Sequence, residues 1–432
     1  MKKDLRLVVF LVFFLIILSS LGPTTTYATN GHQLSAIGAY QQGMGGATTA
    51  APYDASTSIT NPAGMALIGN RTDFSFQTFF PKRETSFGAG GGTTAGGSNM
   101  YLVPAVGWSA PVNDRGDLFF GGGMYGVSGM GVDYDTVPAG AAFETMLSMD
   151  AGTGQANVWS QYQFWKMAPT LAWKNDKLAV GFALNLDYQA FGFKNVYTGT
   201  MGVTAVKYGM DLSEMQGALG YGATAGAIYK FSPVFTAGAS YSSKQKFEDF
   251  KWRLAANDVY WNSMASKNGS YTLNLDFPQQ WAFGIAVRPV KKLLWTADVK
   301  WINYSDTYKA PKLKGDFVGG TELTLDFGWD DVWVYATGLQ YDVTPKLAVR
   351  VGYNYSTSPI NKDDSMEVEN NVAFPAIVKQ RMAGGFTYRF GRHWEFTGAY
   401  MKASKAEMTG AVTGTKISLE EQAADFEISY RF

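Results

Sequence analysis

The C-terminal stretch Phe426-Glu427-Ile428-Ser429-Tyr430-Arg431-Phe432 alternates apolar and polar side chains without a break. Successive side chains of a strand point to opposite faces, so such a strand has one face in an apolar phase and one in a wet interior. The same alternation recurs over residues 281–287, 347–355 and 394–400. A soluble β-sandwich would turn its polar face outward and place a strand about every 8 to 12 residues. The pattern therefore favours a membrane-spanning β-barrel.

The beginning of the chain has the features of a secretory signal peptide over residues 1–28. Lys2, Lys3 and Arg6 precede an apolar run over residues 7–18, and the small residue Ala28 follows at the expected cleavage point. A membrane anchor is the alternative, but the run is shorter than the roughly 20 residues of a spanning helix. Because only helices and closed barrels pair every backbone group in lipid, an exported chain without a helical span enters a membrane as a barrel.

Short turns between apolar strands set the number of strands. Six turn signals, about 40 to 65 residues apart, leave room in each interval for two spanning strands and one long loop. With a first strand near residues 71–80 and a last strand ending at Phe432, they predict an all-β, 14-stranded antiparallel barrel over residues 71–432. The turns lie at Pro111 to Asp117, Lys174 to Lys177, Phe231 to Pro233, Arg288 to Lys292, Asp342 to Lys346 and Gly391 to His393.

Aromatic residues gather beside these turns and predict a girdle at one membrane interface. The general preference of aromatic residues for strands is the alternative explanation. The members of the predicted girdle are Trp108, Phe119, Trp173, Tyr229, Phe231, Trp295, Tyr341, Phe390, Trp394, Tyr430 and Phe432.

Composition excludes several classes of protein. The 432 residues include no cysteine, which rules out disulfide scaffolds and thiolate metal sites. The 36 Lys and Arg residues equal the 36 Asp and Glu residues, so binding of nucleic acid through a basic surface is disfavoured. Aromatic residues make up 15% of the chain, which argues against disorder.

Three segments between the cleavage point and the first strand carry a family resemblance. The glycine-rich residues 43–47, the tripeptide Asp54-Ala55-Ser56 and the tripeptide Asn61-Pro62-Ala63 follow one another in this order. They resemble the N-terminal plug, or hatch, of the FadL family of outer-membrane transporters for long-chain fatty acids and hydrocarbons such as toluene. Further matches at 168–170, 329–331, 352–353 and 385–388 extend the resemblance over the mature chain.

The resemblance implies a 14-stranded barrel whose lumen holds a hatch formed by residues 29–70. It implies that Asn61, Pro62 and Ala63 anchor this hatch near the channel. An amide side chain can bond strand backbone, and proline fixes the chain direction. An ordinary turn at Asn-Pro is the alternative.

The run Gly121, Gly122 and Gly123, which the turn count places in the third strand, is a candidate lateral gate. Glycines continue at 126, 129 and 131, and glycines within a strand weaken its ladder. In the FadL family the third strand is kinked inward and leaves an opening in the wall, which implies lateral exit here. Small residues that leave space for the hatch are the alternative.

Apolar side chains in the predicted loops and lumen are candidates for ligand binding. Exposed apolar loops suit capture of an apolar ligand, and methionine adds adaptability. The alternative is that the loop residues pack on one another as a lid. The candidates are Phe143, Met146, Phe250, Trp252 and Trp261 for capture, and Val332 and Val334 for the lumen.

Catalytic and metal chemistry find little support. The chain has two histidines, His32 and His393, at separate places, so we predict no catalytic residues and no cofactor. Asp363, Asp364, Glu367 and Glu369 form an acidic group that could bind calcium, but such surface loops are more often solvated. We predict no metal site.

The barrel pattern and the resemblance to the FadL family together predict a passive uptake channel for hydrophobic compounds. The resemblance implies long-chain fatty acids as the first candidate substrate. We expect a monomer in the outer membrane of a Gram-negative bacterium, with outer-membrane lipid and a hydrophobic small molecule as partners and no nucleic acid. Loops would capture the ligand, residues Asn30 to Gln33 would rearrange, and the ligand would leave beside the third strand. The alternatives are an aromatic hydrocarbon channel of the same family, a general porin for polar solutes, and a surface adhesion protein.

Overall fold

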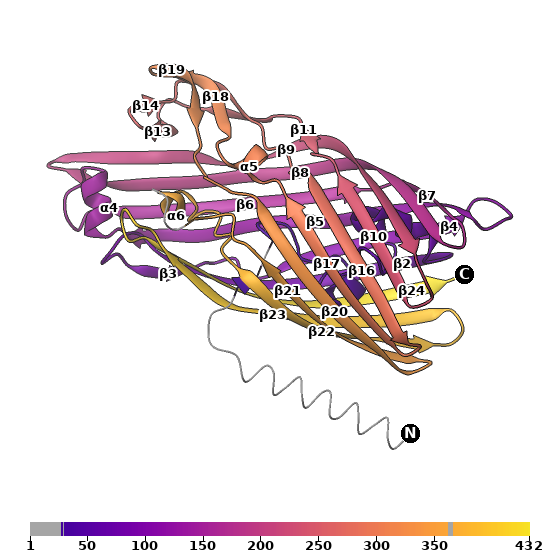
Figure 1. The fold of residues 1–432 in the computed structure, drawn as a ribbon. Coiled ribbons are helices and arrows are strands. Elements are labelled where there is room, and N and C mark those ends of the chain that lie inside the picture. Colours follow the sequence, from indigo (N-terminus) through magenta and orange to yellow (C-terminus); the bar gives the residue numbers. More distant parts are fainter. Residues whose placement is uncertain (1–26, 29, 362–365) are drawn as a thin grey trace.

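The computed structural model describes residues 27–28, 30–361 and 366–432, and within them the chain forms a closed antiparallel barrel of 14 strands (Figure 1). β7 continues β6, and β11 continues β10, so each pair counts as one strand of the wall. The strands in order are β2 (Arg71–Ser86), β4 (Tyr101–Pro111), β5 (Leu118–Pro138), β6 (Gln155–Met167) with β7 (Thr170–Lys174), β8 (Leu178–Met201), β9 (Thr204–Lys230), β10 (Phe235–Ser242) with β11 (Lys246–Phe247), β16 (Gln280–Val290), β17 (Leu293–Ile302), β20 (Val332–Thr344), β21 (Leu347–Ser356), β22 (Lys379–Phe390), β23 (Trp394–Thr409) and β24 (Lys416–Arg431).

The barrel closes where its last strand meets its first. β24 pairs with β2 without interruption, from Arg71 opposite Arg431 to Ser86 opposite Lys416. Closure removes the unpaired sheet edge, which lipid would not tolerate. The predicted alternation in the last strand is confirmed, because Phe426 is 50% exposed on the outside while Glu427 is buried inside.

The six predicted short turns all join neighbouring strands of the barrel. The long connections gather at the opposite end from the C-terminus (Figure 1). They carry β3 (Thr93–Ala95), β12 (Phe250–Leu254), β13 (Val259–Trp261), β14 (Met264–Ala265), β15 (Gly269–Leu273), β18 (Lys312–Phe317), β19 (Gly320–Thr324), α4 (Ala141–Met146), α5 (Ser305–Tyr308) and α6 (Glu367–Asn370). Of these, β12, β15, β18 and β19 form a separate four-stranded sheet.

One member of the predicted girdle points the other way. Phe119 is buried against Met65 and Ala66 inside the barrel, whereas Trp108 and Trp394 are each 43% exposed on the outer surface. A position next to a turn does not determine which face of the strand a side chain occupies. The turn positions alone therefore could not separate inward from outward aromatic residues.

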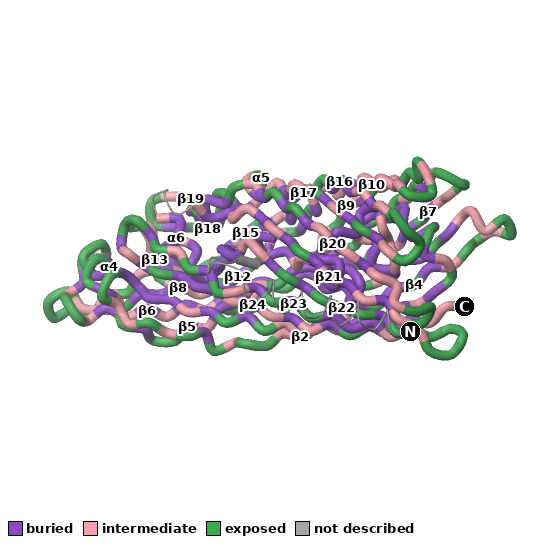
Figure 2. Tube along the Cα trace, turned by 60° about the horizontal axis from the view of Figure 1, so that its bottom comes forward, coloured by how far each residue is buried: buried purple, intermediate pink, exposed green. Residues whose placement is uncertain are grey.

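Residues 30–70, which we call the hatch, fold inside the wall. They form α2 (Ala39–Gly43), α3 (Thr57–Thr60) and the 3-10 turn η1 (Pro62–Ala66), and most of their side chains are buried. Figure 2 shows this buried interior continuing along the strands, with exposed segments at both ends of the molecule. β1 (Tyr27–Ala28) pairs with β22, and the rest of the predicted signal peptide lies outside the described residues. No described helix is both long and apolar enough to cross a bilayer.

Candidate functional site

Asn61 links the hatch to the wall through its side-chain amide. Its Nδ2 donates to the Thr49 carbonyl at 2.8 Å and to the Ala227 carbonyl of β9 at 3.3 Å. Its Oδ1 accepts a hydrogen bond from the Ala63 N–H at 3.2 Å and so caps η1, with Pro62 at the first position of the turn. One buried side chain therefore joins two parts of the hatch and one barrel strand.

Glycines of the wall make room for the hatch where the two touch. A Cβ atom at Gly181 would lie 2.5 Å from the Ala63 nitrogen, and one at Gly352 would lie 2.6 Å from Gly45 Cα. Each of these two glycines stands opposite another glycine of the neighbouring strand, and Cβ atoms added at Gly238 and Gly338 would likewise lie close to hatch backbone, at Thr49 and Met44. The pairs, which we call the glycine belt, are Gly181 with Gly226, Gly238 with Gly284, and Gly338 with Gly352.

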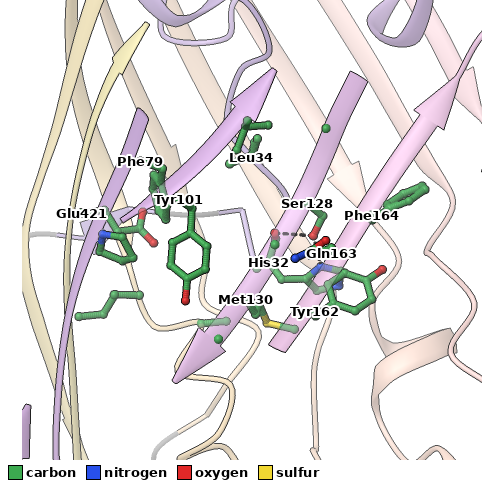
Figure 3. A pocket seen from close by; sticks show the side chains of 18 of the residues that line it. His32, Leu34, Phe79, Tyr101, Ser128, Met130, Tyr162, Gln163, Phe164 and Glu421 are labelled. Atoms are coloured by element: carbon green, nitrogen blue, oxygen red, sulfur yellow. Dashed lines mark hydrogen bonds between the residues drawn. The ribbon is translucent and has the colours of Figure 1, made fainter. Parts of the chain in front are cut away.

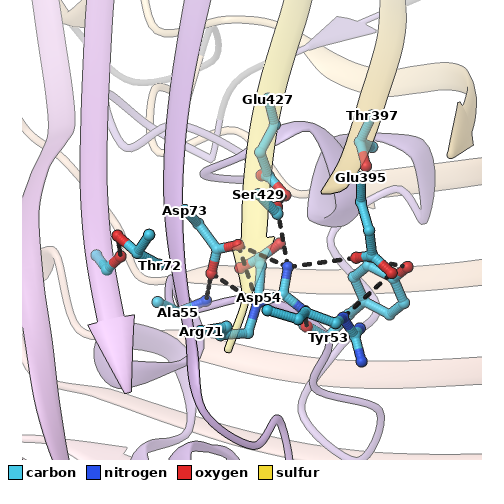
Figure 4. Close-up of polar contacts among 12 residues, drawn as sticks. Tyr53, Asp54, Ala55, Arg71, Thr72, Asp73, Glu395, Thr397, Glu427 and Ser429 are labelled. Atoms are coloured by element: carbon cyan, nitrogen blue, oxygen red, sulfur yellow. Dashed lines mark hydrogen bonds and ion pairs between the residues drawn. The ribbon is translucent and has the colours of Figure 1, made fainter. Parts of the chain in front are cut away.

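A buried ionic cluster adds a second attachment (Figure 4). The Arg71 guanidinium pairs with the Asp73 carboxylate at 2.6 Å and donates to the Tyr53 carbonyl at 2.6 Å. Asp73 in turn accepts from the Ala55 N–H at 2.8 Å. Burial, followed by the neighbouring Asp73 carboxylate, raises the pKa of Asp54 in the hatch to about 6. Charge-assisted hydrogen bonds therefore hold the hatch residues 53–55 against β2.

The wall is not hydrogen-bonded along its whole length. β4 and β5 pair only as far as Ala105 opposite Tyr125. Beyond that point β4 still pairs with β2, while β5 shifts register against β6 between Gly126 and Ser128. The two sides meet again where the Gly97 N–H donates to the Asp133 carbonyl at 2.9 Å. We call this unpaired stretch, between residues 98–104 and 126–132, the wall gap.

A cavity of about 220 Å³ lies behind the wall gap (Figure 3). Both edges of the gap line it, and its lining includes Leu102, which is 52% exposed on the outer face. The cavity therefore reaches from the lumen into the wall. Most of its surface is apolar, and the apolar side chains include Leu34, Phe79, Met130, Phe164 and Leu419.

The predicted gate residues lie beside this gap rather than in it. Gly121 pairs with Ser109 on one side and with Thr170 on the other, and Gly123 pairs with Gly107. A Cβ at Gly121 would lie 2.7 Å from the Met65 Cε of the hatch, whereas a Cβ at Gly122 or Gly123 would meet Ala168 or Tyr125 of the wall, so the alternative that these glycines leave space for the hatch fits Gly121 alone. A gate at Gly121, Gly122 and Gly123 stays untested, and the break in pairing begins at Gly126.

Residues 30–34, which we call the latch, are the hatch segment that lines the cavity, through Gly31, His32 and Leu34. His32 Nδ1 lies 2.5 Å from Ser128 Oγ, and that hydroxyl donates to the His32 carbonyl at 2.7 Å. Since the serine proton is used there, Nδ1 carries the imidazole proton. The Leu34 N–H donates to the Val127 carbonyl at 3.1 Å. The latch is thus bonded to the β5 segment that borders the wall gap.

The His32 ring lies in a cage of aromatic side chains. The ring centroids are 4.7 to 5.5 Å from it. Burial in this cage lowers the pKa of His32 to about 3, and Nε2 has no hydrogen-bond partner among the described residues. The cage consists of Tyr162, Phe277, Tyr304, Tyr308 and Trp329.

The cage predicts that acidification releases the latch. A released His32 titrates near its ordinary pKa of 6.5, whereas the docked ring stays neutral down to about pH 3. Between these values only the released form gains a proton, so docking weakens by about 2 kcal/mol at pH 5 and is unaffected above pH 7. Hydrogen exchange at the Leu34 amide, corrected for its intrinsic rate, should lose protection at pH 5. His32→Gln should remove this pH dependence, and equal protection of the wild-type protein at both pH values would contradict it.

The predicted capture residues divide into two groups. Phe143, Met146 and Trp261 line a second cavity of about 640 Å³ among the long connections. Phe250 and Trp252 are 0% and 2% exposed, and Trp252 Nε1 donates to the Glu214 carbonyl at 2.8 Å. Both rings contact Phe191. Phe250 and Trp252 therefore pack on each other and on Phe191 of β8 and line neither cavity, and a capture role for them stays a prediction.

The predicted lumen residues have the expected orientation. Val332 and Val334 are buried inside, while Trp333 and Tyr335 between and after them are 45% and 47% exposed outside. Neither valine lines the two cavities described above. Their contact with a ligand stays a prediction.

The acidic group of the long connections gives no metal site in the part of the chain that the structure describes. Asp363 and Asp364 lie outside the described residues. Glu369 accepts hydrogen bonds from the N–H and the hydroxyl of Thr413, at 3.0 and 2.9 Å, and so joins two connections.

Several residues of the cavity were missed in the sequence. Arg83, Tyr101 and Phe164 line it together with the latch. Alternation along residues 71–86 places Arg83 inside the barrel, and the glycines at 126, 129 and 131 mark the edge of the gap. Those two signals were present, but nothing in the sequence places the latch against them.

Comparison with known proteins agrees with this architecture. The family model "Outer membrane protein transport protein (OMPP1/FadL/TodX)" matches residues 21–429. Outer membrane protein P1 of Haemophilus influenzae is 24% identical over 325 residues, which cover 70% of this chain and 66% of that relative.

Solved structures share the fold. The crystal structure of a Pseudomonas aeruginosa FadL homologue has a TM-score of 0.73 at 16% identity, over 93% of this chain and 100% of the other. The Pseudomonas putida toluene transporter TodX has a TM-score of 0.71 at 17% identity, over 92% and 99%. The chain therefore belongs to the OMPP1/FadL/TodX family and is a channel of the Gram-negative outer membrane that carries hydrophobic compounds, not an enzyme.

Proposed function

We propose that this channel takes up long-chain fatty acids and releases them sideways into the outer membrane through the wall gap. The observation that carries the proposal is the unpaired stretch of wall between residues 98–104 and 126–132 with an apolar cavity behind it. The free energy of an apolar molecule is lower out of water than in it. A sideways path into lipid is therefore more favourable for such a molecule than a water-filled pore.

The path has three stages. The cavity lined by Phe143, Met146 and Trp261 faces the long connections and collects the ligand. Release of the latch then opens the way past the His32 cage. The ligand leaves between β4 and β5, while the hatch keeps the lumen closed to small solutes. The driving force is diffusion down a gradient. A single barrel contains the whole path, so a monomer is sufficient for transport.

Aromatic hydrocarbons are the second candidate substrate. The fold is shared with the Pseudomonas putida toluene transporter, and the cage around His32 would accept a planar ring in place of the imidazole. The two candidates differ in charge, since a fatty acid brings a carboxylate that needs a cationic partner.

Uptake by whole cells tests the proposal. Gram-negative cells that lack other members of the family and express this chain should take up a labelled C18 fatty acid at least tenfold faster than cells with an empty vector. Vesicles that contain the purified protein should not swell in small sugars. Fast sugar-driven swelling without fatty acid uptake would favour a general porin instead.

A further inference from the structure

Arg83 is a buried cation in the wall of the cavity. It lies on β2 with its side chain toward the lumen and is 4% exposed. Its Nη1 donates to the Tyr101 hydroxyl at 3.3 Å, and the guanidinium carbon lies 5.6 Å from the centre of that ring. Both residues line the cavity behind the wall gap.

Two donors of this guanidinium are unused. Nε and Nη2 are buried and have no hydrogen-bond partner among the described residues. No described carboxylate lies within ion-pair distance of Arg83, whereas Arg71 has two such partners, Asp73 and Glu395. Burying a charge without a partner raises the free energy of the folded protein. Two unpaired donors on a buried guanidinium therefore indicate a binding position for an anion from outside the protein.

Glu421, the acidic residue that lines the cavity, does not pair with these two donors of Arg83. Glu421 lines the same cavity, but it interacts electrostatically with Arg381 of β22 rather than pairing with Arg83. Arg83 stands opposite Leu419 in the ladder, and Pro81 stands opposite Glu421, so the two charged residues are diagonal neighbours. The Nε and Nη2 atoms of Arg83 are therefore left without a carboxylate partner among the described residues.

We propose that Arg83 binds the carboxylate of a long-chain fatty acid at the wall gap, which makes the substrate an amphipathic monocarboxylate rather than an uncharged hydrocarbon. Nε and Nη2 lie on one edge of the guanidinium plane, and this edge matches the two oxygens of a carboxylate. The apolar part of the cavity, which includes Phe79, Met130 and Leu419, accommodates the alkyl chain next to it. This inference rests on the proposed function and adds the residue that recognises the head group of the substrate.

A pair of ligands that differ only in the head group tests the assignment. Equilibrium binding of a C18 fatty acid and of the C18 alcohol with the same chain is measured for the purified wild-type protein and for Arg83→Gln, Arg83→Lys and Lys82→Gln. Arg83→Gln should weaken fatty acid binding roughly tenfold or more and leave alcohol binding within twofold. Arg83→Lys keeps the charge and should retain more of the fatty acid affinity. Lys82→Gln removes one positive charge from the exposed face of the same strand and should change neither ligand.

Folding of each variant is checked by the different gel mobility of heated and unheated barrel. If a folded Arg83→Gln protein binds the fatty acid as tightly as wild type, or loses both ligands equally, the assignment of Arg83 is overturned while uptake of hydrophobic compounds stands. If the wild-type protein binds neither ligand, the proposed function fails and the assignment fails with it.

Discussion

Gly181→Ala is expected to convert a plugged barrel into a leaky one. The added Cβ would overlap the backbone of Pro62 and lie 2.5 Å from the Ala63 nitrogen. Backbone atoms cannot turn aside as a side chain can, so either the Asn61-Pro62-Ala63 turn or β8 has to move. Overpacking of this kind costs about 1–3 kcal/mol. The barrel itself keeps its ladders, because Ala172 and Gly226 flank this position and neither loses a backbone hydrogen bond.

Ion conductance across a planar bilayer measures the leak. A 14-stranded barrel encloses more space than its own side chains fill, so loss of the hatch contacts should raise conductance several-fold. Gly384→Ala is the matched control, since its added Cβ would have Arg350 O as nearest neighbour at 3.9 Å. A Gly181→Ala barrel that conducts no better than this control would show that the glycine belt does not hold the hatch.

The barrel was largely predictable because its signals are local. Alternation in segments such as 347–355 and turn residues such as Asp342 to Lys346 depend on near neighbours, and together they gave the strands and their order. The inward position of Phe119 was missed. A single aromatic residue next to a turn can face either side, and the hatch residues that bury it lie more than fifty positions earlier.

The site was less predictable because it depends on where two neighbouring strands, β4 and β5, are not hydrogen-bonded to each other. Gly121 and Gly126 look alike in the sequence, yet the first is paired on both sides and the second begins the wall gap. The difference arises because the pairing of β4 with β5 ends at Ala105 opposite Tyr125. The cage around His32 likewise consists of residues between positions 162 and 329, and no local sequence pattern predicts that residues so far apart in the chain come into contact.

Closing the wall gap with a disulfide is expected to stop uptake. A Cβ built on Gly126 would lie 3.7 Å from the Val103 Cβ across the gap. This separation is close to the mean of about 3.8 Å found in disulfides. Val103→Cys with Gly126→Cys should therefore form a bond that joins β4 to β5 where they do not pair. Val103 Cγ1, which an added Cβ at position 126 would overlap, is removed by the same change.

The chain has no cysteine of its own, so the engineered pair is the only one that can respond to oxidant or reductant. Each single-cysteine variant serves as a control and should transport at the same rate in both conditions. Binding of the ligand at the 640 Å³ cavity among the long connections should persist in the oxidised double variant, because neither position 103 nor position 126 lines that cavity.

Uptake of a labelled C18 fatty acid by cells that carry the double variant, before and after reduction, tests sideways release most directly. We expect the oxidised channel to take up at least tenfold less than the reduced channel, with reduction restoring the wild-type rate. Equal uptake by the oxidised and reduced channels, with the disulfide verified by mass spectrometry, would contradict exit through the wall gap.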